Sequence, residues 1–430
     1  MKIPLIIAIS VVLIQCEPIV PQQSQTNKKL IFDNHEYEDI IGYAKVIPVE
    51  NSQRKELENP VINLNERDQL IMTFDLLTDQ FENLSAKIFH CNKDWDKSVL
   101  RDMEFLSQIN NYRITDFNYS NNTVQPYINY QFQIPKPTIS GNYVVAVFRR
   151  ANPDDVLLTR RFMVVNPVAS IGQTVRVSTT INKRDENHQI EFDIRYGNLL
   201  VNAPTKDISP VILQNHNWYT AIKDIPPTLV RANDGSLEFR HLDLKTNFPG
   251  WNEFRFADLR TLNVSGRNVA RITNTGQEIM APLKLDGTRG PIPYTLNFQD
   301  INGNYLIQND DPGEGILNAD YANVQFSLKS EPINGDVYVV GQFNNWRLTD
   351  INRMKYTTQN GLGRYETTIP LKQGYYEYLY YVDSDELPPY HFEGSHFQAE
   401  DEYEILVYYR KPGNVNDELI GYKRFRSIER

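Results

Sequence analysis

Three side chains with metal-binding chemistry lie close together at His391, Glu393 and His396. Histidine nitrogens and a carboxylate at such short spacing could ligate a metal ion. A complete coordination shell would need further ligands, and the sequence offers no second cluster of them. We therefore interpret this segment as a solvated loop and expect no bound metal or cofactor.

Cys91 directly follows His90, a pair that could act as a nucleophile and its base. In a strand, however, adjacent side chains point to opposite faces of the sheet, so the two groups would not meet. We expect Cys91 to be a buried or half-buried thiol.

Asp300, Asn302 and Asn304 alternate like the first ligands of a calcium-binding loop. The glycine lies at the wrong position, and no glutamate follows at the distance of the bidentate ligand. The pair Asn302-Gly303 instead predicts a tight hairpin turn between residues 294–298 and 305–307.

Acidic runs occur at residues 383–386 and 400–402. A glycosidase needs two carboxyl groups about 5–10 Å apart in a cleft, whereas acidic runs in loops are usually solvated. The signatures of serine hydrolases, zinc peptidases and nucleotide-binding loops do not occur in the sequence. The residue types and spacings therefore predict a protein without catalytic activity.

These residues lie between segments in which apolar and polar side chains alternate, the period of strands with one buried face. Turns that contain glycine separate the segments, and no long helical period occurs. We expect an all-β protein of three tandem, immunoglobulin- or fibronectin-like β-sandwiches, because 430 residues exceed one ordinary core. The predicted sandwiches cover residues 30–166, 167–309 and 310–430, and residues 404–409 form the last strong strand of the third.

Charge and cysteine content restrict the class of protein. The formal net charge is -10 and the pI is about 5.3, so the chain lacks the basic footprint of a nucleic-acid-binding protein. Two cysteines exclude a disulfide framework, so the cores must be stable without cross-links.

Residues 1–16 have the features of an export signal. A basic start precedes an apolar run at residues 5–14 that is too short to span a bilayer. The run ends in a sequence that resembles a bacterial lipobox, which would make Cys16 a lipidation site, although Gln15 replaces the usual small residue. Ordinary cleavage after Cys16 is the alternative. Residues 17–29 are polar and rich in Pro and Gln, which predicts a flexible tether.

The segment GQFNNW at residues 341–346 resembles the G-x-F-N-x-W signature of the early-set β-sandwiches that bind glycogen and starch. The resemblance implies an early-set-like third domain. It leaves open a glucan-binding envelope protein, in which Trp346 or Trp251 would stack on sugar rings. Because a loop tryptophan in a sandwich more often covers the end of a core, we prefer a structural role for Trp346.

Motifs along nearly the whole mature chain resemble, in the same order, those of the plug family of the bacterial type IX secretion system. The matching segments are residues 90–95, 120–123, 127–130, 140–143, 160–162, 188–189, 214–218, 248–256, 320–321, 341–346, 371–376, 393–395, 403–410 and 417–421.

This resemblance implies a non-enzymatic protein that binds the periplasmic end of the outer-membrane translocon barrel and closes it when no substrate is exported. It places the protein in the periplasm, at the inner face of the outer membrane, as a monomer within that complex. Aromatic side chains often anchor protein interfaces. The candidates for contact with the barrel are Trp95, Trp218, Trp251, Trp346, Tyr375, Tyr376 and Tyr378.

Overall fold

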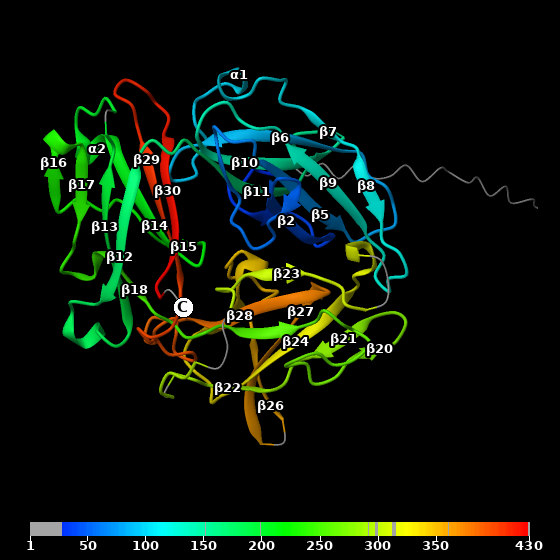
Figure 1. Cartoon of the computed structure of the whole chain (residues 1–430). Helices are drawn as coiled ribbons and strands as arrows, with labels where there is room; N and C mark the ends of the chain where they lie inside the picture. Colours follow the sequence, from blue (N-terminus) through cyan, green and yellow to red (C-terminus); the bar gives the residue numbers. More distant parts are fainter. Residues whose placement is uncertain are drawn as a thin grey trace, which may run out of the picture.

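The chain folds into three β-sandwiches that pack against one another (Figure 1). The computed structural model describes residues 28–428 except 151, 198, 291, 297–299, 312–314 and 360. The predicted export signal with Cys16, and the predicted tether up to residue 27, lie outside the described residues. The prediction of an all-β fold is confirmed, because strands dominate the described residues and the two α-helices found there, α1 (Asp102–Phe105) and α2 (Pro204–Asp207), have four residues each.

The first sandwich contains two sheets whose strands are antiparallel except where β4 pairs with β11. One sheet consists of β1 (His35–Glu36), β4 (Val61–Asn63), β6 (Leu84–Cys91), β7 (Tyr112–Ile114), β10 (Gly141–Arg149) and β11 (Val156–Val165). The other consists of β2 (Ile41–Glu50), β3 (Gln53–Arg54), β5 (Gln69–Leu76), β8 (Asp116–Tyr119) and β9 (Ile128–Ile134). Aromatic and aliphatic side chains from both sheets fill the core between them.

The second sandwich is built from two stretches of chain that are far apart in the sequence. Its first sheet consists of β12 (Ser170–Val177), β13 (Asn187–Arg195), β16 (Leu229–Arg231), β17 (Ser236–Phe239) and β18 (Asn247–Pro249). Its second sheet consists of β14 (Ile208–Gln214), β15 (Asn217–Ile222), β29 (Glu402–Tyr409) and β30 (Glu418–Arg426). Figure 1 shows the two final strands, in red and orange-red, beside the green strands of this lobe.

The third sandwich lies between these two stretches in the sequence. One side is formed by β19 (Arg255–Asp258), β23 (Tyr305–Ile307), β25 (Asp336–Val340) and β28 (Gly374–Asp383). The other side is formed by β20 (Thr273–Asn274), β21 (Ile279–Pro282), β22 (Asp286–Gly287), β24 (Tyr321–Lys329), β26 (Lys355–Gln359) and β27 (Leu362–Lys372). Short 3-10 helices occur in the connections of the second and third sandwiches, at Ile181–Lys183, Ala232–Asp234, Leu244–Thr246, Gly315–Asn318 and Gln342–Asn344.

Strand pairing corrects two parts of the expected order. Residues 404–409 do not end the third unit, because β29 pairs with β14 and β30 of the second sandwich. Residues 305–307, expected in the second unit, belong to the third, because β23 pairs with β28. Part of their expected hairpin partner, residues 294–298, lies outside the described residues. Alternation of apolar and polar residues predicts that a segment is a strand but carries no information about its partner strand. The expected units therefore grouped strands by their order along the chain.

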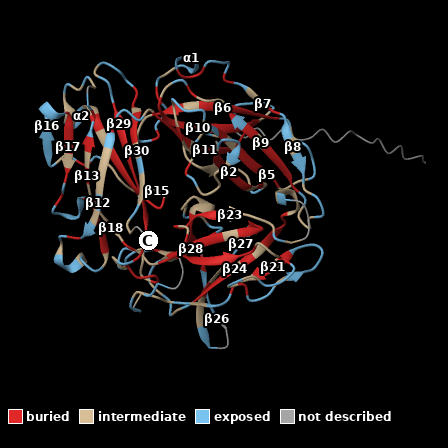
Figure 2. Ribbon diagram, viewed as in Figure 1, coloured by how far each residue is buried: buried red, intermediate tan, exposed pale blue. Residues whose placement is uncertain are grey.

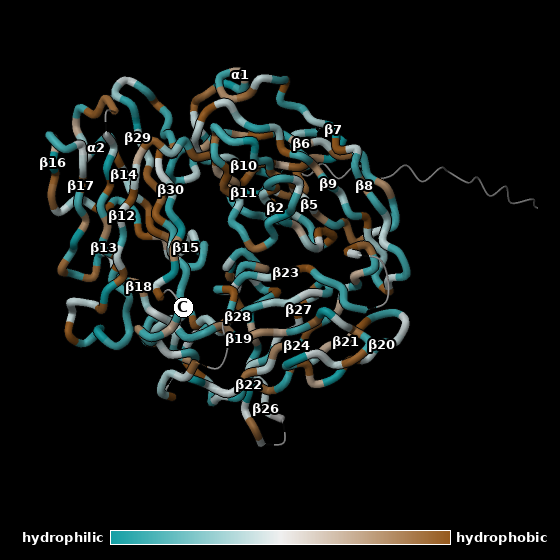
Figure 3. Tube along the Cα trace, viewed as in Figure 1, coloured by the Kyte–Doolittle hydropathy of each residue, from teal (hydrophilic) through white to brown (hydrophobic). Residues whose placement is uncertain are grey.

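Burial follows the strands in all three lobes, and exposed residues concentrate in loops and edge strands such as β16 (Figure 2). Hydrophobic residues lie along the packed strands, and further hydrophobic stretches lie in some outer loops (Figure 3). No helix among the described residues has the length and apolar character needed to cross a membrane.

Candidate functional site at the joints between the sandwiches

The joint between the first and second sandwiches is a hydrophobic core of its own. Alternate side chains of β29 explain how it forms: Ile405 and Val407 point into the second sandwich, whereas Leu406 and Tyr408 point toward the first. Side chains of β6, β10 and β11 meet them, so this joint is packed like a domain interior. Its buried members are Cys91, Trp95, Val144, Met163, Val165, Val211, Leu213, Leu406, Tyr408 and Leu419.

Two tryptophans and an arginine close the edge of this joint. The rings of Trp95 and Trp218 meet edge to face with centroids 5.0 Å apart. The guanidinium group of Arg161 lies 4.3 Å from the centre of the Trp95 ring, and its Nη1 lies 3.0 Å from Asp33 Oδ1. An arginine held between an aromatic face and a carboxylate fixes both neighbours in place.

The joint between the first and third sandwiches contains a buried ion pair. Lys372 Nζ donates to Asp75 Oδ2 at 2.6 Å, and the Tyr321 hydroxyl donates to the same oxygen at 2.7 Å. Asn129 Nδ2 donates to the other carboxylate oxygen at 2.7 Å. Burial lowers the pKa of Lys372, although Asp75 opposes this effect. Lys372 and Tyr321 also help to line a groove of about 740 Å³ between the two sandwiches.

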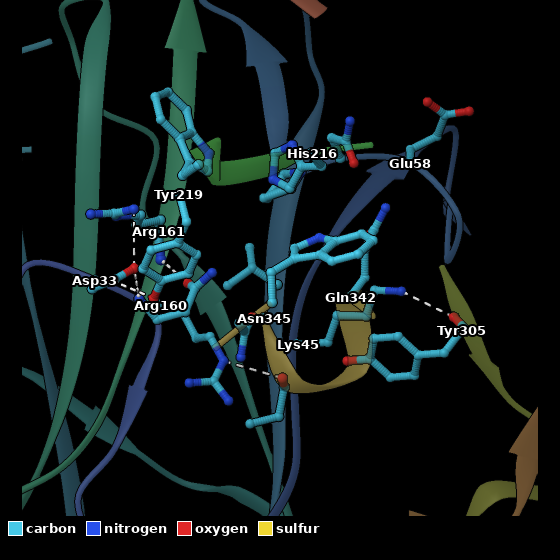
Figure 4. Close-up of a pocket in the computed structure, with 17 residues that line it drawn as sticks. Asp33, Lys45, Glu58, Arg160, Arg161, His216, Tyr219, Tyr305, Gln342 and Asn345 are labelled. Atoms are coloured by element: carbon cyan, nitrogen blue, oxygen red, sulfur yellow. Dashed lines mark hydrogen bonds and ion pairs between the residues drawn. The ribbon is translucent and has the colours of Figure 1, made fainter. Parts of the chain in front are cut away.

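All three sandwiches meet around a small pocket of about 70 Å³ (Figure 4). Lys45 donates to the carbonyl oxygens of Glu56 and Tyr305 at 2.7 and 3.3 Å, and burial lowers its pKa to about 8. Glu36, close to the pocket, pairs with Arg160 and, at 3.2 Å, with Arg347. Burial alone would raise the pKa of Glu36, but these two cations hold it below its usual value. The charged groups at the junction thus have partners within the chain.

The loop at residues 341–346 joins the second and third sandwiches rather than presenting an open platform. A Cβ on Gly341 would lie 2.5 Å from the carbonyl oxygen of Glu377, so a larger residue does not fit. Asn344 accepts from the Gly341 N–H at 3.1 Å and donates to the Val339 carbonyl at 2.8 Å. Trp346 then packs edge to face on Phe254, with ring centroids 5.9 Å apart.

Three of the four tryptophans have a left-handed backbone conformation, with φ of 68° at Trp95, 47° at Trp251 and 60° at Trp346. This conformation is uncommon for bulky residues and persists where the surroundings hold it. Trp95 lies in the first joint, and Trp251 and Trp346 lie in the small cluster between the second and third sandwiches. Sequence patterns do not reveal backbone φ, so this shared feature could not be predicted.

Glu393 is buried between two arginines of the third sandwich. Arg255 Nε donates to it at 3.0 Å, and Arg289 Nη2 lies 2.6 Å from its second oxygen. The Tyr380 N–H donates to it at 2.9 Å. Burial opposes ionisation, but the two guanidinium groups hold the pKa of Glu393 at about 2. The segment 391–396 is therefore not the solvated loop expected from the sequence, because this carboxylate anchors it.

The remaining chemical candidates also have structural roles. Cys91 is buried in the joint and burial raises its pKa to about 12, while His90 points into the first sandwich against Tyr143. The expected buried thiol on the opposite face from His90 is thus confirmed. Asn302 and Gly303 have φ of 56° and 74°, as the predicted tight turn requires.

The structure divides the seven aromatic candidates for partner contact. Trp95, Tyr376 and Tyr378 are 4%, 2% and 2% exposed and pack against other parts of the chain, so their contact with a partner stays a prediction. Trp218, Trp251, Trp346 and Tyr375 are half-buried. Sequence reasoning missed Asp75, Lys372 and Arg255, although a charged residue inside an apolar strand, such as Asp75 in residues 69–76, is a usable signal.

Acid is expected to destabilise the fold through two buried histidines. Burial lowers the pKa values of His90 and His188 to about 4. In the unfolded chain the pKa of a histidine is near 6.5. Between pH 4 and 6.5 the unfolded chain therefore binds more protons than the folded chain, so the free energy of unfolding falls as the pH drops from about 6.5 to about 4. Urea midpoints measured across this range should fall less steeply for His90→Phe than for the unmodified chain. Equal slopes would contradict the assignment.

Taken together, the fold and its joints define a class of protein: three β-sandwiches packed into one body, with buried ion pairs such as Lys372–Asp75 and Arg255–Glu393. Within the part of the chain that the structure describes, no group of three or more His, Cys, Asp or Glu side chains is arranged to hold a metal ion.

Comparison with known proteins places one sandwich in a particular family. Residues 44–166 match the family model of the type 9 secretion system plug protein, first domain. The first sandwich is therefore similar to the first domain of plug proteins, and the resemblance noted in the sequence is confirmed over residues 44–166. No match among curated proteins was found. A crystal structure of a hypothetical protein from Parabacteroides merdae is similar, with a TM-score of 0.85 and 27% identity over 93% of this chain and 100% of that one.

Proposed function

We propose that this protein is a plug of the type IX secretion system, a non-enzymatic stopper on the periplasmic side of the outer membrane. It binds the periplasmic end of the translocon barrel and closes it when no substrate is being exported. The observation that carries this proposal is the plug-family match over residues 44–166. An opening wide enough for folded cargo would leak solutes, so its stopper must be rigid.

The packing between the sandwiches supports this role. Interfaces between domains of one chain are usually polar and allow relative motion. Here the first joint is a hydrophobic core, and the second contains a buried ion pair. Force on one sandwich is thus transmitted to the others, as a stopper requires.

An exposed apolar segment is a candidate for contact with the barrel. Val99, Met103 and Ile109 lie between β6 and β7 and are 74%, 91% and 87% exposed, while Phe105 and Leu106 anchor the same segment in the core. Large apolar side chains exposed together often mark an interaction site. Of the aromatic candidates, Tyr375 is half-buried and stacks on Phe256.

Deletion of the gene is expected to make the outer membrane permeable to large antibiotics, and the intact chain should co-purify with the barrel from detergent-solubilised membranes. Reintroducing the unmodified chain should restore exclusion. A chain with Met103→Glu and Ile109→Glu should fold, since both side chains are exposed, but should recover less barrel. Normal exclusion in the deletion strain would rule the proposal out.

A further inference from the structure

The chain crosses between the second and third sandwiches twice, and the two crossings run side by side. Residues 250–254 lead from β18 to β19, and residues 384–401 lead from β28 back to β29. The His396 N–H donates to the Trp251 carbonyl at 2.9 Å, and the Gly250 N–H donates to Ser395 Oγ at 3.0 Å. A Cβ on Gly250 would lie 2.3 Å from the His396 carbonyl oxygen, so the two backbones are in direct contact.

Four carboxyl groups are buried where these crossings meet, from four different segments. Glu253 lies on the first crossing, Asp300 on the loop before β23, Glu377 on β28 and Asp401 at the end of the second crossing. Each is at most 5% exposed.

Hydrogen bonds connect these carboxyl groups to the backbones of both crossings. Asp300 Oδ2 accepts from the Phe254 N–H at 2.6 Å. Glu253 accepts from the Glu400 N–H at 3.4 Å, which links the first crossing to the second. Glu377 accepts from the Ile301 and Gly303 N–H groups at 2.9 and 3.1 Å, and so holds the loop that carries Asp300.

The groups around the cluster do little to neutralise it. His188 Nδ1 lies 3.5 Å from Asp401, but the hydroxyl of Tyr403 and the carbonyl of Phe397 bind its two nitrogens, which suits the neutral ring. Arg426 lies 3.1 Å from Glu400 and pairs with that carboxylate. The Tyr294 hydroxyl donates to Glu253, the Tyr375 hydroxyl donates to Glu377 at 3.4 Å, and the Tyr403 hydroxyl lies near Asp401. Behind them, His396 contacts the Tyr294 ring, and Arg289 pairs with Glu393.

Burial therefore favours the protonated form of Asp300, Glu377 and Asp401. Burial raises the pKa of Asp300 to about 7, and the Glu253 charge adds to the effect. Burial also raises the pKa values of Glu377 and Asp401 well above their usual range.

We propose that this carboxyl cluster is a proton-controlled joint, which holds the second and third sandwiches together while it is protonated and loosens the two crossings when it loses protons. In an open joint, water would solvate the carboxylates and restore ordinary acidity. The closed joint thus binds more protons than the open one. The balance shifts toward opening as the pH rises through about 7, where Asp300 ionises.

Hydrogen exchange on the intact chain tests this joint. After correction for the intrinsic exchange rate, protection of residues 250–254 and 395–401 should fall about 10-fold per pH unit for each proton released between pH 6 and 8.5. Protection of β10 should stay constant over the same range. Asp300→Asn should flatten the profile, because a neutral amide replaces the protonated acid, and Asp350→Asn, an exposed acid, should leave it unchanged.

A flat profile in the unmodified chain would overturn the proposal, whether or not any variant folds. The same steep profile in Asp300→Asn would also overturn it. If Asp300→Asn fails to fold, Glu253→Gln provides the second variant, and its profile should be less steep than that of the unmodified chain.

Discussion

Replacing Asp75 with alanine is expected to reduce the free energy of unfolding by about 3–5 kcal/mol, because Lys372 then stays buried without its counter-ion. The Lys372 ammonium is 1% exposed and Asp75 is fully buried, so water cannot solvate the remaining charge. The Tyr321 hydroxyl and Asn129 amide also lose their acceptor. Denaturant midpoints of the two chains provide the measurement.

A double replacement separates the charge effect from a loss of packing. Asp75→Leu combined with Lys372→Met removes both charges and keeps most of the volume, so it should recover much of the lost stability. Arg353→Ala, which removes the exposed partner of Asp336, should leave the midpoint nearly unchanged. If Asp75→Ala behaves like Arg353→Ala, the buried pair does not hold the first and third sandwiches together.

Glu393→Gln is expected to destabilise the third sandwich by a similar amount, about 3–5 kcal/mol, because Arg255 keeps its buried charge and loses its main partner. The pH dependence has a definite sign. The pKa of Glu393 is about 2 in the fold and near 4.5 when exposed, so its stabilising effect is complete above about 4.5. That contribution is lost as the pH falls toward about 2.

Unfolding midpoints between pH 7 and pH 2 test this prediction. The difference in unfolding midpoint between the unmodified chain and Glu393→Gln should be largest near neutral pH and should become smaller in acid. Glu386→Gln is a suitable control, because Glu386 is an exposed acid in the same crossing. A difference in unfolding midpoint that does not depend on pH would mean that Glu393 stabilises the fold through its shape rather than its charge.

Local patterns in the sequence were enough to predict the strands but not how they assemble. The turn at Asn302-Gly303 and the opposite faces of His90 and Cys91 follow from rules that act over a few residues. The partner of β29 does not, because pairing with β14 joins residues about two hundred positions apart.

One signal for this pairing was nevertheless present. All eight residues of β29 are buried, and its side chains fill the second sandwich on one face and the first joint on the other. A nearly continuous apolar run predicts a strand covered on both faces, which the end strand of a separate sandwich would not be. The ion pairs of Lys372 and Glu393 depend on such long-range contacts and could not be derived from spacing.

The insertion of the third sandwich between β18 and β29 determines the order in which the chain can fold. Two of the four strands in one sheet of the second sandwich, β29 and β30, are synthesised after the entire third sandwich. The first sandwich can form as soon as it emerges, whereas the second must wait for residues 402–426, and contacts so distant in sequence form slowly. The hydrophobic joint with the first sandwich thus cannot be completed before β29 and β30 are synthesised, whereas the joint between the first and third sandwiches can form earlier.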